Sequence, residues 1–418
     1  MALILFIYLL LNKSKNNIEV ICGPYFSLEL GFTLKSFFNS FGYSNINYFE
    51  NKFLNFDFRY SYLLNISIKN LSKIVNLLLI GTNLRLEVPL LNSSLRKNYL
   101  NNVKFKAYSI GFALDYLTYP VINLGSSIKF FLKFLMGYSL VSKYFLFNKY
   151  YNTYFLNSNN FINLYIFLGT STLIRMDSNS ILNSLFKFLN DLSLPIKNLN
   201  IISRHLGRLT SYELGILPKL NKNKFNNKSF NFLLGLDNIK SEYKKTYNFN
   251  VFQGYFYFSN FFEYINLVLP TSIYSEKVSS YINLEGRFRF TNKAIVPFKF
   301  IFLDTYIIES FAILFRNIFP QNFSIFNNFY YIVKFFNILF NFYLNYLVNL
   351  NNYIVLFEKN IFNVSHKEII LYKNIFNYKF NNSIFSKIIY NYYSNDMFSK
   401  KSKVMSIASK KIKITSFK

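Results

Sequence analysis

The sequence predicts a doubly wound α/β fold, in which helices cover both faces of a parallel sheet. Short apolar runs that end at a glycine recur three times, in the strings LIGTN, FLGTS and LLGLD around Gly81, Gly169 and Gly235. An unbroken apolar run is typical of a strand that is buried on both faces of a parallel sheet. The spacing of the runs is too wide and too irregular for a solenoid repeat. In doubly wound folds, turns of this kind line the crevice that binds ligands.

The first part of the chain has the order strand, turn, helix that opens a βα unit. Ile18–Ile21 is predicted to be a short strand that ends at Gly23 and Pro24, and Ser27–Phe41 is predicted to be a helix. Before them, Ala2–Leu11 is almost wholly apolar, but it is too short to cross a bilayer, which needs about 17–25 residues. We therefore predict a buried helix at Ala2–Leu11.

The composition points to codon drift more than to a charged partner. The chain has 418 residues, 52% of them hydrophobic, with 53 Phe, 35 Tyr and no Trp, and its formal net charge is +28. Phe, Tyr, Asn, Ile and Lys share AT-rich codons, so we interpret the bias as drift in an AT-rich organellar genome. The lysines are scattered, which favours solvated surfaces over a nucleic-acid footprint. The exception is Lys400–Lys418, which contains seven Lys and no acidic residue.

The residue types exclude iron–sulfur clusters held by cysteines and metal sites built from several histidines. Cys22 is the only cysteine, whereas an iron–sulfur cluster is usually held by four thiolates. The two histidines, His205 and His366, cannot build a multi-histidine metal site. We therefore predict no catalytic, cofactor-binding or metal-ligating residue on this chain.

The stretch Leu267–Arg289 joins a strand to a tight turn. A short apolar strand at Val268 and Leu269 is predicted to stop at Pro270, because proline cannot donate to a sheet ladder. Gly286 follows in a turn where the backbone needs room. The order of strand, proline, Glu-Lys, Tyr-x-Asn and Glu-Gly-Arg resembles a turn of the molybdopterin oxidoreductase superfamily.

The string LLLIGTNLRLEVPLLNSSLRK resembles, within that superfamily, the 75 kDa-subunit family of respiratory complex I. Further resemblance extends from Ala2 to about Lys411, with a poor patch at Ser310–Ile384. It includes a predicted helix at Ile201–Gly215 and the segment Tyr392–Asp396 near the C-terminus. The matching residues of the string are Gly81, Thr82, Asn83, Arg85, Glu87, Pro89, Asn92, Arg96 and Lys97.

The resemblance implies molybdopterin-oxidoreductase-like α/β domains without cofactor at residues 1–309. A divergent, mainly helical region at 310–384 and a C-terminal segment with a Lys-rich tail at 385–418 would follow. The chain departs from cofactor-using members at Tyr255–Phe258, where bulky aromatics would block a phosphate, and at Asn266, where the family has Asp. The bulky aromatics favour a filled, cofactor-free crevice.

The segment Tyr331–Phe357 resembles a membrane helix at first sight. One face carries amides spaced by four residues, which predicts an amphipathic helix and no transmembrane span, because amides are costly in lipid. These amides belong to Asn337, Asn341, Asn345 and Asn349.

In functional terms, the resemblance implies the C-terminal half of the family's subunit in the peripheral matrix arm of mitochondrial NADH:ubiquinone oxidoreductase. The chain would support electron transfer from NADH to ubiquinone as part of an enzyme, without catalytic residues of its own. The iron–sulfur clusters are expected on a separate, cysteine-rich N-terminal half that contacts Ala2–Leu11, and other peripheral-arm subunits are expected partners. No basic, Ser-rich transit peptide precedes Ala2, so we expect the gene to be mitochondrial and the protein to lie on the matrix side of the inner membrane.

Two other classes of function stay open. A working molybdopterin oxidoreductase would need a metal ligand and a roomy pterin crevice. A basic organellar nucleic-acid-binding protein would need aromatics and lysines interleaved on one surface. In this sequence the aromatics lie inside apolar strand runs.

Overall fold

The computed structural model describes thirteen parts of the chain. They are residues 18–40, 42–50, 59–112, 118–136, 164–191, 194–217, 230–236, 249–255, 264–297, 301–318, 384–385, 399 and 401–415. The helices predicted at Ala2–Leu11 and Tyr331–Phe357 lie outside these residues, as does Tyr392–Asp396.

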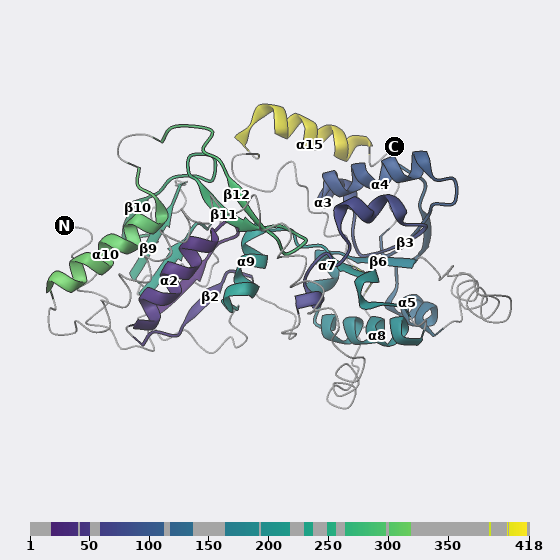
Figure 1. Cartoon of the computed structure of the whole chain (residues 1–418), viewed down its shortest axis with the longest axis horizontal. Coiled ribbons are helices and arrows are strands. Elements are labelled where there is room, and N and C mark those ends of the chain that lie inside the picture. The colour runs from purple at the N-terminus through teal and green to yellow at the C-terminus, as the bar shows by residue number, and fades with distance from the viewer. Residues whose placement is uncertain are drawn as a thin grey trace, which may run out of the picture. The chain divides into compact units, whose positions relative to one another are not determined.

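The chain forms two compact units, each assembled from separate segments (Figure 1). Unit 1 takes the described residues of Met1–Asn47, Lys222–Ser279 and Thr291–Asn377. Unit 2 takes those of Tyr48–Asn221, Ser280–Phe290 and Tyr378–Lys418. Residues near the C-terminus therefore join residues of the first half of the chain in unit 2.

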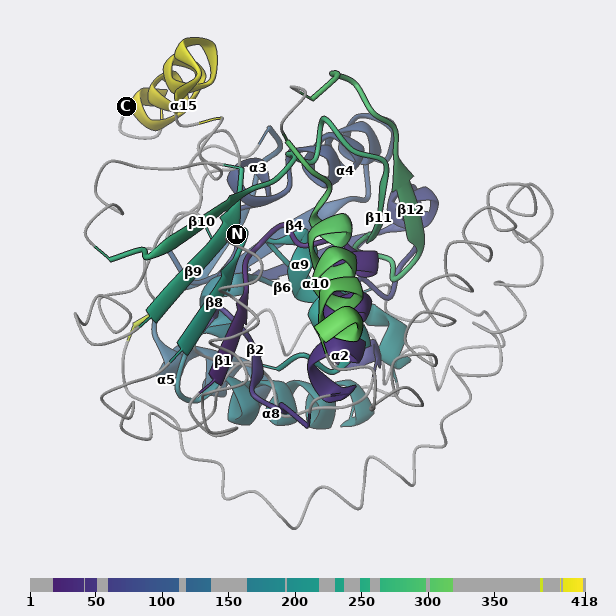
Figure 2. The same ribbon diagram turned by 90° about the vertical axis from the view of Figure 1, so that its left-hand side faces the viewer.

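Unit 1 is built on a five-stranded sheet of order β10-β9-β8-β1-β2, in which β1, β8, β9 and β10 run parallel. The helices α2 (Leu28–Ser40) and α10 (Asp304–Ile318) pack together on one face of the sheet (Figure 2). Phe232 of β8 contacts both helices, with ring centroids 6.1 Å from Phe38 and 6.5 Å from Phe311. The strands are β1 (Ile18–Cys22), β2 (Ile46–Tyr48), β8 (Phe230–Leu234), β9 (Phe249–Gly254) and β10 (Leu267–Pro270).

Unit 2 contains a second five-stranded sheet, of order β5-β4-β3-β6-β7, and every pair in it is parallel. Its central strand β3 is buried on both faces. Leu78 and Ile80 enter one core with α5 and α8, whereas Leu77 and Leu79 enter the other with α4. The strands are β3 (Asn76–Ile80), β4 (Lys106–Ile110), β5 (Ile122–Gly125), β6 (Leu164–Leu168) and β7 (Leu199–Ile201). The helices are α3 (Leu84–Glu87), α4 (Pro89–Asn101), α5 (Ile128–Leu135), α7 (Thr170–Leu173), α8 (Ser178–Asp191), α9 (Leu206–Leu214) and α15 (Lys403–Thr415), with 3-10 turns at Arg59–Ser61, Ile68–Lys73 and Ile196–Asn198.

The two-sided burial of β3 confirms the predicted doubly wound α/β fold. The strands expected at Ile18–Ile21 and at the three glycine-ended runs are all present. The helix expected over Ile201–Gly215 is only partly right. Ile201 ends strand β7, and the amide of Ile202 donates to the carbonyl of Leu168 at the sheet edge, so helix α9 begins five residues later.

A two-stranded hairpin follows β10. Strand β11 (Ser279–Ile282) pairs with β12 (Phe288–Thr291), and Gly286 in the turn has a φ of 77°. The amide of Arg287 donates to Asn283 Oδ1 at 2.8 Å and closes the loop. The predicted end of a strand at Pro270 and the tight turn at Gly286 are confirmed, but the sequence did not predict the two hairpin strands.

None of the helices formed by the described residues combines the length and the apolar character needed to cross a bilayer.

Candidate functional site

The carboxyl edge of the unit 2 sheet is the place where a doubly wound fold binds ligands. The chain turns there at Gly81 after β3, at Gly111 after β4 and at Gly169 after β6. The amide of Gly81 donates to the carbonyl of Ile110 at 2.9 Å, and that of Gly169 donates to Ile80 at 3.1 Å. The amide of Gly111 donates to the carbonyl of Gly125 at 2.8 Å. Each of these glycine amides therefore donates to the last carbonyl of a neighbouring strand and extends the parallel ladder.

Polar side chains complete the turn after β3. Ser171 Oγ donates to the carbonyl of Gly81, and Thr82 Oγ1 donates to the buried carboxylate of Glu87. Asn83 Oδ1 accepts from the amide of Arg85 at 3.2 Å and caps helix α3. The residues here that match the family pattern thus hold the turn and the start of α3 in place. They are Thr82, Asn83, Arg85 and Glu87.

The edge is closed by Phe385, which comes from the last part of the chain. Its side chain is only 2% exposed, and its backbone amide donates to the carbonyl of Ser126 at 3.1 Å. The ring meets Phe131 of α5 edge-on, with centroids 6.1 Å apart. Phe385 also lies beside the glycine turns, since a Cβ built on Gly81 would lie 3.7 Å from its ring and one built on Gly111 would lie 3.8 Å from its Cβ.

Arg175 holds this closing segment in place. Its guanidinium carbon lies 5.0 Å from the centre of the Phe385 ring, and Nη1 donates to the carbonyl of Ile384 at 3.2 Å. Nε and Nη2 form a forked ion pair with Asp177, at 2.8 and 2.9 Å. Both side chains are nearly buried, so the pair is shielded from water. Asp177 lies directly before α8.

A pterin nucleotide does not fit this edge. Phosphate binding at such turns depends on free backbone amides and on close approach to a glycine. Here the amides of Gly81, Gly111 and Gly169 are bonded to carbonyls, and the approach to Gly81 is filled by Ser171, Thr172 and Phe385. No step of pterin chemistry can be assigned to these residues.

At the carboxyl edge of the unit 1 sheet, the amides that follow the strands are likewise bonded to carbonyls of neighbouring strands. The amide of Gly23 donates to Leu234 and that of Gly235 donates to Gln253, both at 2.8 Å. The amide of Thr271 donates to Gly254 at 3.1 Å. Gly235 has a φ of +54°, and a Cβ built on it would meet nothing within 4 Å.

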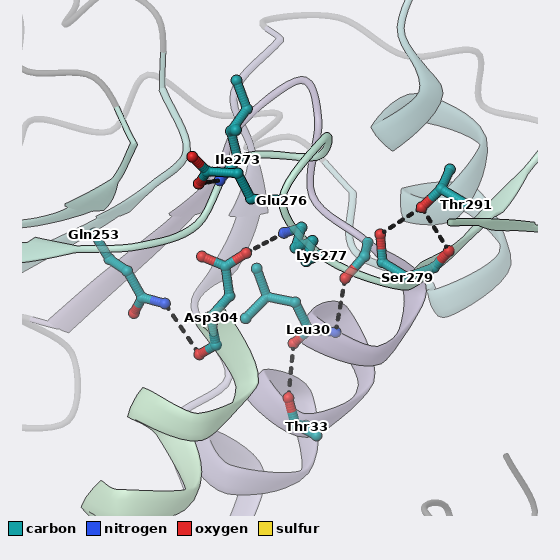
Figure 3. Close-up of polar contacts among 10 residues, drawn as sticks. Leu30, Thr33, Gln253, Ile273, Glu276, Lys277, Ser279, Thr291 and Asp304 are labelled. Carbon is teal, nitrogen blue, oxygen red and sulfur yellow. Dashed lines mark hydrogen bonds and ion pairs between the residues drawn. The ribbon is translucent and has the colours of Figure 1, made fainter. Parts of the chain in front are cut away.

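Polar contacts beside this edge tie the loop after β10 to the start of α10 (Figure 3). Lys277 and Asp304 form a buried ion pair, and Gln253 Nε2 donates to the carbonyl of Asp304 at 3.1 Å. Glu276 Oε2 accepts from the amide of Ile273 at 3.2 Å. The charge of Lys277 is thus offset by a carboxylate of the same unit, which makes it a structural lysine and a poor anion ligand.

The sequence predicted one crevice lined by three glycine turns, but the structure brings only two of these turns together. Gly81 and Gly169 follow neighbouring strands in unit 2, whereas Gly235 belongs to unit 1. Asn266 Oδ1 accepts from the amide of Asn250 at 2.8 Å, so this departure from the family serves the backbone. Residues 256–258, expected to fill the phosphate loop, lie outside the described part of the chain. The closing residue Phe385 was missed, because no local pattern separates it from the other phenylalanines.

The one cysteine has no features of a ligand. Cys22 ends strand β1 and is buried, which raises the pKa of its thiol to about 12. Within the described ranges, no three His, Cys, Asp or Glu side chains come together in a way that could hold a metal ion. The prediction that the chain carries no catalytic, cofactor-binding or metal-ligating residue stays a prediction.

Comparison with known proteins supplies the remaining evidence. The family model described as molybdopterin oxidoreductase matches residues 7–300. The NADH-ubiquinone oxidoreductase 75 kDa subunit of Reclinomonas americana is 33% identical over 57% of this chain and 33% of its own length. A subunit of the NADH-quinone oxidoreductase of Rickettsia felis is 27% identical over 71% of this chain and 42% of its own length.

A third relative and one solved structure complete the comparison. The mitochondrial NADH-ubiquinone oxidoreductase 78 kDa subunit of Candida albicans is 27% identical over 69% of this chain and 38% of its own length. The chain therefore spans between a third and about two fifths of the relatives that it matches. A chain of the formyltransferase/hydrolase complex of Methylorubrum extorquens is 9% identical and superposes on 74% of this chain with a TM-score of 0.48.

Proposed function

Because the chain belongs to the molybdopterin oxidoreductase family, we propose that it is a structural subunit of NADH:ubiquinone oxidoreductase, respiratory complex I. Its relatives are named as subunits of NADH-ubiquinone or NADH-quinone oxidoreductases. In this proposal the chain belongs to the peripheral arm and supports electron transfer from NADH to ubiquinone. The matched share, less than half of each relative's length, fits a part of such a subunit, and we propose that this part is its C-terminal half.

The observation that carries the structural role is the closed edge of unit 2. Phe385 is buried beside the turns of Gly81 and Gly111, and the amides of these glycines are bonded to carbonyls, which supports a chain without a cofactor at this edge. A chain that keeps the sheet and helices of the fold, but whose own side chains cover the edge where ligands bind, is suited to hold neighbouring subunits in place. The same observation disfavours a working molybdopterin enzyme.

The redox centres are proposed to lie on another polypeptide. One buried cysteine cannot hold an iron–sulfur cluster, which needs several thiolates. The relatives are more than twice as long as the region matched here. We therefore place the clusters on a cysteine-rich partner that corresponds to the rest of the family's length, in contact with the segment Ala2–Leu11.

The proposed place is the matrix side of the mitochondrial inner membrane, with a mitochondrial gene. The Candida albicans relative is named as mitochondrial. The richness in Phe, Tyr, Asn, Ile and Lys fits an AT-rich organellar genome. The nucleic-acid alternative is disfavoured because the largest fully buried side chains of the described residues are all phenylalanines.

The test is to isolate the native respiratory assembly and identify its polypeptides. We expect this chain to co-migrate with NADH:ubiquinone reductase activity and with a separate cysteine-rich chain. The isolated chain should contain no stoichiometric iron or molybdenum. Its absence from the active assembly, or salt-sensitive binding to RNA in its place, would contradict the proposal.

A further inference from the structure

Helix α15 is the yellow helix of Figure 1, and two of its apolar side chains are exposed. Val404 is 75% exposed and Ile407 is 52% exposed. Residues three apart on a helix lie on the same face. Ser409, two positions after Ile407 and so on the opposite side, is only 6% exposed. Helix α15 therefore buries Ser409 on one side and leaves Val404 and Ile407 exposed on the other.

The sequence of α15 does not favour an independent helix. It has 13 residues, and isolated helices below about 12–15 residues are marginal in water. The β-branched residues Val404, Ile407, Ile412 and Ile414 lower its helix propensity further. Helices of this kind draw most of their stability from packing of an amphipathic face. The exposed face thus calls for a partner.

The charge around this face gives the partner's chemistry. The stretch Lys400–Lys418 contains seven Lys and no Asp or Glu, which sets it apart from the scattered lysines elsewhere. Lys403 lies on the exposed side, next to Val404. An apolar stripe flanked by ammonium groups is complementary to an apolar groove with a carboxylate rim.

We propose that α15 docks into an apolar groove, rimmed by Asp and Glu side chains, on another protein subunit. Naming that subunit's assembly as complex I rests on the proposed function, whereas the groove chemistry does not. A lipid surface fits less well. Helices at a membrane interface present a broad apolar face with Trp, Phe or Leu anchors. Residues 403–415 contain none of these, and among the described side chains of α15 the exposed apolar stripe consists of Val404 and Ile407, while Ser409 stays buried.

The experiment is zero-length carbodiimide cross-linking of the native assembly, read by mass spectrometry. We expect amide bonds from Lys403 and other lysines of Lys400–Lys418 to carboxylates of another subunit. The double variant V404S/I407S should lower the yield of these cross-links about tenfold or more, since it removes the apolar part of the contact. The control L90S/V103S changes two residues of unit 2 that are 80% and 102% exposed, and it should leave the yield unchanged.

Two outcomes would overturn the docking proposal. In the first, these lysines form no cross-link to another protein, and an amine-reactive reagent modifies them freely in the intact assembly. In the second, the full chain floats with phosphatidylglycerol vesicles and V404S/I407S abolishes the flotation, so that the occupant is lipid. If the chain co-migrates with the assembly but α15 is free, only the docking proposal fails. If α15 cross-links to a protein outside the assembly, only the proposed function fails.

Discussion

Arg175 stacks on Phe385, a residue 210 positions later in the sequence, with its guanidinium carbon 5.0 Å from the ring centre. A shielded cation over an aromatic face is worth about 2 kcal/mol. The same guanidinium pairs with Asp177 and binds the carbonyl of Ile384. Residues 384–385 are thereby held over the carboxyl edge of the unit 2 sheet, the edge where doubly wound folds bind ligands. The contacts that stabilise these two residues thus also cover that edge.

Replacing Phe385 should therefore destabilise unit 2 markedly. Phe385→Ala removes a ring that is 2% exposed, and such changes cost about 3–5 kcal/mol. Urea unfolding followed by circular dichroism measures the loss. The control is Phe288→Ala, since Phe288 is 47% exposed, and it should cost much less. Equal losses for the two variants would show that Phe385 does not close a core.

The buried ion pair of Arg175 should be more sensitive than a solvated one. Asp177→Ala leaves a nearly buried guanidinium without its carboxylate, which costs about 3–5 kcal/mol. Glu213→Ala breaks a more exposed pair, in which the side chain of Glu213 is 24% exposed and that of Arg59 is 34% exposed, and it also removes the acceptor of Tyr62 Oη at 3.3 Å. It should cost about 1–2 kcal/mol. The two free energies of unfolding should differ clearly, and a Glu213 effect as large as that of Asp177 would refute the argument.

Gly81 and Gly235 have nearly equal φ angles, so a comparison of the two positions separates backbone strain from steric crowding of a new Cβ. Gly81 has a φ of +57° and Gly235 one of +54°, so alanine should cost about 1–2 kcal/mol at either position. At Gly81 the new Cβ would also lie 2.5 Å from Thr172 Cγ2, whereas at Gly235 nothing lies within 4 Å. Gly81→Ala should therefore lose about 1–3 kcal/mol more than Gly235→Ala in thermal or urea unfolding. A smaller loss at Gly81 would mean that its turn can relax.

His205 should make the protein sensitive to mild acid. Burial first, and then Arg204 and Arg208, lower the pKa of this imidazole to about 3, despite the carboxylate of Glu50 at 3.9 Å. The native state stays neutral while the unfolded state binds a proton below its ordinary pKa of about 6.5. The free energy of unfolding is thus undiminished above that pH and falls as the pH drops from about 6.5 toward 3.

The expected loss between pH 7.5 and 5.5 is about 1 kcal/mol, in a range where carboxylates contribute little. His205→Gln should flatten the pH profile over that interval, whatever its effect on the absolute stability. An unchanged slope in the variant would show that His205 does not titrate as argued.

The sequence by itself determined the class of fold and the positions of the most apolar strands. The runs at β3, β6 and β8 are apolar on both sides, and only a strand covered on both faces buries such a run completely. Pro270 and Gly286 marked a strand end and a turn, because each acts through its own backbone. Local chemistry is sufficient for features of this kind.

Only the tertiary structure showed which residue covers the carboxyl edge of the unit 2 sheet. Phe385 has no pattern around it that separates it from 52 other phenylalanines, and its role arises only where it meets Arg175 and the turn of Gly81. The division of the glycine turns between two sheets depends likewise on pairing between distant strands. The sequence sets the local preferences of each segment, but long-range packing determines which segments meet. In unit 2 that packing places Phe385 beside the glycine turns at the carboxyl edge of the sheet.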